Sequence, residues 1–190
     1  MTRIALFFAF LASAAAVFAQ AGLEPVPDSQ VSAETLHLAA ATIKAPLGWK
    51  WYRMPVADRA AQQLHPQMTS ETYVAQNPNN REGYIVSVIR GGPATTVNDD
   101  FMKGMGDGMT RTAPKTGWHI TDYAFGPSKI PFEGAYHFSC VATNDAGVAK
   151  YRMGYVFGSG EQYQISMSSR ESEEPVQFRQ FVMSFQWAKP

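Results

Sequence analysis

Few residues in this sequence combine the type and the spacing that catalysis requires. Cys140 is the single cysteine, and His137 precedes it by three residues. On a strand this spacing sends the two side chains to opposite faces, so they cannot form a Cys–His nucleophile pair. Cys140 shares its expected face with Phe138, and we therefore expect a buried, structural thiol.

The histidines do not show the close or four-residue spacing that is typical of a metal site. They are His37, His65, His119 and His137. We therefore expect no metal ion and no cofactor. An envelope hydrolase or lyase is an alternative, in which folding would assemble a site from scattered polar residues. Its candidate residues are His65, His119, Asp122 and Arg152.

Two short motifs resemble functional sites but fail in detail. Gly104, Gly106 and Gly108 are followed by Met109 where a dinucleotide-binding loop has its third glycine, and no Gly-Lys-Ser/Thr follows. The adjacent carboxylates 173–174 are better explained as charges at the start of a helix than as a catalytic pair. The sequence therefore predicts no catalytic residue.

Residues 49–53, Trp-Lys-Trp-Tyr-Arg, form the most unusual segment of the chain. On a strand, Trp49 and Trp51 lie on one face and Tyr52 on the other. One face is expected to belong to the core, and the other could present an aromatic and basic patch of the kind found at interfaces. Trp51, Tyr52 and Arg53 are thus the candidate partner-binding residues. The expected function is non-catalytic binding of a partner protein or a small ligand.

Residues 1–19 are typical of a cleavable secretory signal peptide. Arg3 precedes a long apolar run, and Val17-Phe18-Ala19 has the small-x-small pattern that signal peptidase reads. We predict cleavage between Ala19 and Gln20, and an exported protein that is periplasmic or secreted. The apolar run, of about 15 residues, is shorter than a spanning helix needs, although a retained anchor is an alternative. No membrane span is expected after cleavage.

The composition indicates one globular domain after a short leader. The chain of 190 residues has 16 basic and 16 acidic residues, so nothing points to nucleic-acid binding. A single cysteine allows no internal disulfide, and stability must come from packing. We expect a flexible leader over residues 20–35 and a single domain over residues 36–190. The partner, the ligand and the oligomeric state stay open.

The pattern of apolar residues predicts a sheet and two helices. Strands are predicted at 36–45, 49–54, 69–75, 84–89, 118–125, 130–142, 148–157 and 163–167, with hairpin turns at 77–80, 144–147 and 158–160. A four-residue repeat predicts a helix over 97–112 with Thr96 as its N-cap. A closing helix is predicted after Ser172 as cap, with Pro175 in its first turn. Its apolar stripe comprises Phe178, Phe181, Val182 and Phe185.

These elements predict an α+β fold, an antiparallel meander packed by a mid-chain and a C-terminal helix. Their order, with Pro46-Leu47-Gly48-Trp49 early and Phe181-Val182-Met183-Ser184-Phe185 at the close, resembles the family of the photosystem II extrinsic protein PsbP, which includes Ran-binding Mog proteins and many exported bacterial proteins. The resemblance covers residues 36–187. It implies a sheet sandwiched by helices, usually without catalysis, and no single partner. The metal-associated residues of the photosystem members cannot be placed on this chain. A structural or assembly factor of the envelope is a third possibility.

Overall fold

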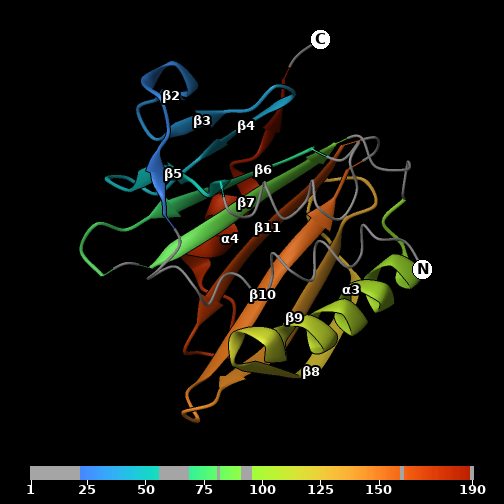
Figure 1. Ribbon diagram of the computed structural model, residues 1–190. Helices are drawn as coiled ribbons and strands as arrows, with labels where there is room; N and C mark the ends of the chain where they lie inside the picture. The colour runs from blue at the N-terminus through green and yellow to red at the C-terminus, as the bar shows by residue number, and fades with distance from the viewer. Residues whose placement is uncertain (1–21, 56–68, 81, 91–95, 159–160, 189–190) are drawn as a thin grey trace.

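An eight-stranded antiparallel sheet forms the centre of the protein, which we describe from a computed structural model over residues 22–55, 69–80, 82–90, 96–158 and 161–188 (Figure 1). Its strands are β1 (Glu24–Pro25), β5 (Lys50–Arg53), β6 (Thr69–Gln76), β7 (Gly83–Arg90), β8 (Trp118–Pro127), β9 (Tyr136–Asn144), β10 (Ala149–Phe157) and β11 (Gln162–Ser169). They lie in the order β1-β5-β6-β7-β11-β10-β9-β8. The expected pairing of β6 with β7 is confirmed, as is the pairing of β10 with both β9 and β11.

A second, four-stranded sheet pairs strands from the N-terminal part of the described chain with its last strand. It comprises β2 (Val31–Ser32), β3 (Thr35–His37), β4 (Ala41–Lys44) and β12 (Gln186–Trp187), in the order β12-β4-β3-β2. Residues 22–35, expected to be a flexible leader, instead supply β1, the short 3₁₀ helix η2 (Asp28–Gln30), β2 and the start of β3. The strand predicted over 36–45 is the hairpin of β3 and β4, closed by a hydrogen bond from the Leu38 amide to the Ala41 carbonyl.

Two helices cover opposite faces of the large sheet, which confirms the predicted α+β class. The helix α4 (Val176–Met183) and the small sheet pack on one face, while α3 (Asp99–Thr112) packs on the other and is followed by the 3₁₀ helix η3 (Ala113–Thr116) (Figure 1). The alternation of the strands divides their side chains between two apolar clusters. Tyr155 and Phe157 of β10 belong to the cluster under α4, and Val156 between them belongs to the cluster under α3.

The mid-chain helix begins later than its sequence predicts. Its N-cap is Asn98, whose side chain accepts a hydrogen bond from the Phe101 amide at 2.9 Å, so Thr96 is not the cap. The four-residue apolar repeat is confirmed, because Phe101, Met105 and Met109 are all buried. Gly106 has a packing role: a Cβ there would overlap the ring of Tyr123, which lies against the helix and donates to the Met102 carbonyl at 2.9 Å. The conformational entropy that Gly106 costs the helix is thus offset by the close packing of α3 against Tyr123 of β8.

The closing helix also begins later than expected. Pro175 is its N-cap and makes no side-chain cap bond, so Ser172 does not cap it. Glu173 and Glu174 precede the helix, and the Glu174 carboxylate instead accepts a hydrogen bond from the Tyr155 hydroxyl. The predicted apolar stripe is confirmed by the burial of Phe178, Phe181, Val182 and Phe185.

The strand predicted over 130–142 is shorter than the pattern suggests, because β9 begins only at Tyr136. The preceding Ile130 and Phe132 are buried in the cluster under α4, whereas Phe138 and Cys140 belong to the opposite cluster. The Phe132 ring stacks on Phe157, with centroids 4.6 Å apart. A single stretch of alternating apolar residues therefore supplies side chains to both apolar clusters, on opposite faces of the sheet.

An aromatic cluster attaches α4 to the sheet. Tyr84 of β7 lies at its centre, with its ring centroid 4.7 Å from Trp49, 5.1 Å from Phe178 and 4.9 Å from Phe181. Phe181 also lies 6.0 Å from Trp51, and it is only 2% exposed. Burial of these large rings supplies the main apolar contact between the helix and the sheet.

Replacing Phe181 by Ala should destabilise the protein by about 3–5 kcal/mol, since it leaves a cavity between α4 and β7. Met183→Ala is the matched control, because Met183 lies on the same helix and is 47% exposed. Urea unfolding of both variants measures the difference. Equal stability of the two variants would show that α4 does not depend on this contact.

A charged network closes one end of β6, β7 and β11. Arg90 donates to Glu71 at 2.8 Å and to Glu161 at 2.7 Å, and Tyr163 donates to Glu161 at 2.7 Å. Partial burial raises the pKa of Glu161, but the hydrogen bonds from Arg90 and Tyr163 outweigh this effect and hold its pKa below the ordinary range. Glu161 therefore stabilises the fold in its ionised form.

Because the folded-state pKa of Glu161 is lowered, its contribution should be fully present above the pKa of an unfolded glutamate. It should be lost as the pH falls through the folded-state value. The unfolding free energy of Glu161→Gln should therefore fall less steeply than that of the wild type as the pH is lowered from about pH 5 to about pH 3. Denaturant titrations at several pH values test this, and parallel curves for the two proteins would contradict it.

Candidate functional site

The three residues proposed for partner binding do not share one exposed patch. Trp51 is buried in the cluster under α4, and its indole Nε1 donates to the Glu34 carbonyl at 2.8 Å. Tyr52 packs against the opposite cluster, as the alternation predicts, and Arg53, the next residue on the strand, is half-buried. Trp51 therefore belongs to the core, which corrects its assignment to a surface.

The turn before this segment presents a different residue. The Trp49 amide donates to the Pro46 carbonyl at 3.1 Å, and Gly48 has a φ of +79°, a value that glycine adopts without strain. This turn projects Leu47, whose side chain is 87% exposed. An apolar side chain is thus held in solvent by an ordered turn, next to the buried Trp49.

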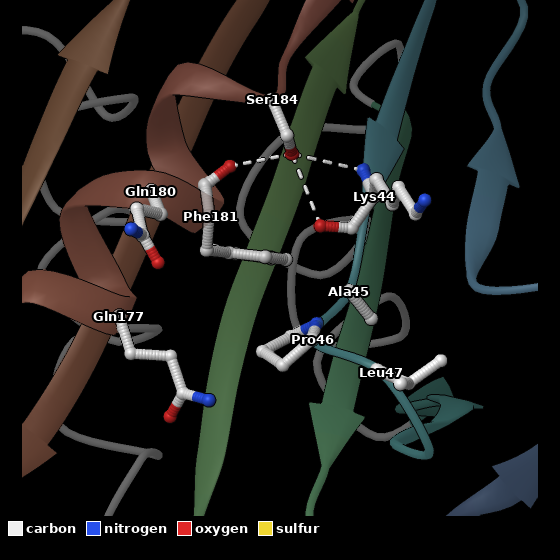
Figure 2. A pocket seen from close by; sticks show the side chains of 8 residues that line it. All are labelled: Lys44, Ala45, Pro46, Leu47, Gln177, Gln180, Phe181 and Ser184. Atoms are coloured by element: carbon white, nitrogen blue, oxygen red, sulfur yellow. Dashed lines mark hydrogen bonds between the residues drawn. The ribbon is translucent and has the colours of Figure 1, made fainter.

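A groove of about 280 Å³ separates this turn from α4, and we call it the turn groove (Figure 2). It is lined by Lys44, Ala45, Pro46, Leu47, Gln177, Gln180, Phe181 and Ser184. Figure 2 shows Gln177 and Gln180 on the helical side and Pro46 on the opposite side. Lys44 is the only charged residue among these eight, so the groove offers amide hydrogen bonds and apolar contact.

Ser184 fixes the spacing of the two walls. Its hydroxyl accepts a hydrogen bond from the Lys44 amide at 3.0 Å, and it lies 2.7 Å from the Phe181 carbonyl and 3.0 Å from the Lys44 carbonyl (Figure 2). A hydroxyl has one proton, so it donates to one of these two carbonyls at a time. The end of α4 is thereby held against β4.

A second concavity lies on the other side of α4, and we call it the helix-start cavity. It has a volume of about 520 Å³ and lies between the residues after β8, the α4-side face of β9 and β10, and the start of α4. Its polar lining includes Lys129, His137, Ser139, Glu174 and Arg179. Burial raises the pKa of the Tyr155 hydroxyl on its floor, and the hydrogen bond to Glu174 adds to this effect.

Three of the four residues of the hydrolase alternative lie in the described part of the chain. His65 lies outside the described residues. His119 is exposed and lies 3.2 Å from the Asp145 carboxylate, while Asp122 lies in an interruption of the β8–β9 ladder, with a φ of +52°. Arg152 is buried, with its guanidinium 5.5 Å from the Trp118 ring centroid.

His119 and Arg152 point to opposite faces of the sheet. Trp118 contacts Arg152, and His119 follows Trp118 on β8, so its side chain leaves the other face. Burial lowers the pKa of Arg152 to about 10. The structure thus separates two of the four residues that this alternative requires.

Over the described part of the chain, no group of three or more His, Cys, Asp or Glu side chains is arranged to hold a metal ion. No helix in these same ranges has the length and apolar character needed to cross a membrane. Neither a known protein family nor a curated protein sequence matches this chain.

Several residues that line the two concavities were not singled out from the sequence. Gln177 and Gln180 on α4 and Ser184 directly after it recur at i, i+3 and i+7, beside the apolar stripe, so their common face could have been found. Leu47 could have been noted as an apolar residue in a Pro-Leu-Gly turn. Lys129 carries no such signal, because only folding brings it near α4.

Cys140 is 2% exposed, and burial raises the pKa of its thiol to about 11, although the charge of Arg152 partly opposes the shift. The native protein should therefore resist a thiol reagent at pH 8 and react completely after unfolding. Mass spectrometry with and without denaturant counts the label. Rapid labelling of the native protein would contradict a shielded thiol.

Proposed function

We propose that this chain is an exported, non-catalytic domain that binds a partner protein at the turn groove. The observation that carries the proposal is the 87% exposure of Leu47 on an ordered turn. Exposure of a large apolar side chain to water is unfavourable, and burial of the same area against a partner would be favourable. Apolar side chains at the centre of a polar rim are typical of protein interfaces.

The other lining residues suit an uncharged, extended segment of that partner. Gln177 and Gln180 each offer an amide donor and an acceptor, which can pair with the backbone of an extended chain. Pro46 and Phe181 add apolar surface for a side chain. Lys44 is its only titratable group, and the Ser184 hydroxyl bonds to backbone groups, so the lining shows no paired nucleophile and base.

Export and the kinship with PsbP-like proteins are part of the same proposal. The apolar run ending in Val17-Phe18-Ala19 supports export to the periplasm or the medium. The order of strands and helices, with α3 and α4 on opposite faces of an antiparallel sheet, is what the resemblance to the PsbP family implies. The diverse partners of that family agree with a role in binding.

Leu47→Asp should weaken partner capture about tenfold or more, because it removes an apolar contact and places a charge in the interface. Val148→Asp is the matched control, since Val148 is also an apolar turn residue and is 51% exposed. A photo-crosslinking residue at position 47 identifies the partner in the native host, and titration of the purified partner then measures the affinity of each variant. Equal affinity of the two variants would exclude the turn groove. Turnover of an ester, phosphate or glycan by the pure protein would favour the hydrolase alternative instead.

A further inference from the structure

The helix-start cavity has a different chemistry from the turn groove. Its volume of about 520 Å³ falls in the range of small-molecule sites, whereas the turn groove is about half as large. Its walls come from three separate parts of the chain: the residues following β8, the strands β9 and β10, and the start of α4. A molecule held there would contact all three.

Two cations line this cavity without a partner. Lys129 and Arg179 form no ion pair with any residue of the described ranges. The only acid in the lining is Glu174, and its carboxylate accepts the hydroxyl of Tyr155. Arg179 lines the same cavity as Tyr155, and its positive charge opposes the rise in the pKa of that hydroxyl. The lining thus has one more positive than negative charge.

The cavity also offers apolar and hydrogen-bonding surface. Val176, in the first turn of α4, is 74% exposed, and Met153 lies in the wall formed by β9 and β10. His137 and Ser139 are two residues apart on β9, so their side chains leave the same face of the sheet. A ligand that matches this lining has an anionic head and a short apolar body.

We propose that the helix-start cavity binds a small organic anion, whose carboxylate or phosphate group contacts Arg179 and Lys129 while its apolar part lies against Val176 and Met153. Arginine presents a planar fork of donors that fits either oxyanion, and lysine adds a point charge. This site is separate from the turn groove, so it gives the protein a ligand in addition to the proposed partner.

The test uses three probes of matched length: hexanoate, hexyl phosphate and the neutral hexanamide. Binding to the purified protein is followed by NMR, with the backbone amides of His137, Ser139 and Gly154 as reporters inside the cavity. We expect hexanoate or hexyl phosphate to shift these signals, and to bind about tenfold or more tightly than hexanamide. The stronger of the two anions distinguishes a carboxylate ligand from a phosphate ligand. Binding of the anion should also weaken as salt is added.

The double variant Lys129→Gln and Arg179→Gln should reduce anion affinity about tenfold or more and leave hexanamide unaffected. Lys103→Gln with Arg111→Gln, on exposed positions of α3, removes the same charge from the opposite face as a control. Equal binding of hexanamide and hexanoate, or an unchanged affinity in the cavity variant, would overturn the anionic ligand. If no probe shifts the reporters, the cavity is not a ligand site, and the proposed partner site at Leu47 is unaffected by that result.

Discussion

The docking of α4 on the aromatic face of the sheet is the contact on which both concavities depend. Tyr84 receives Phe178 and Phe181 from the helix, and Trp49 from the chain that leads into β5. Since the helix has only eight residues, its own hydrogen bonds cannot hold it in place. Its position is therefore set by packing, and that position determines the shape of both concavities.

The side chains of α4 face three different parts of the molecule. Phe178 and Phe181 face the core, Gln177 and Gln180 line the turn groove, and Arg179 lines the helix-start cavity. Successive helical residues are rotated by about 100° around the helix axis, so the side chains of sequence neighbours project toward different surfaces. A rotation or shift of α4 would change both concavities together, because they share this one wall.

Local patterns were sufficient to predict most of the framework. Turn residues at 144–147 and alternation in 148–157 identified a hairpin because both signals depend only on neighbouring residues. The same reasoning failed for Ile130 and Phe132, where an alternating sequence continues after the strand ladder has ended. It also failed at the helix starts, where Asn98 replaces Thr96 as the cap and Pro175 takes the place expected for Ser172. The choice among nearby caps is decided by tertiary packing.

The candidate sites were less accessible to sequence reasoning. Trp51 has the side chain of an interface residue, yet its ring fits under α4 and is buried there. An aromatic residue type does not by itself distinguish a core position from an interface position, because burial of a large apolar ring is favourable in both. The helix-start cavity depends on the approach of Lys129 to Arg179, fifty residues apart in the chain, which no local pattern encodes.

The irregular backbone at Asp122 has a consequence for how copies of this protein meet. β8 is the longer of the two edge strands of the large sheet, and a long flat edge strand is a template on which a second chain can add. The shift of register between Thr121 and Ala124 interrupts that template near its middle, and Asp122 places a charge there. Such a break disfavours the addition of a further strand along the full ten-residue length of β8.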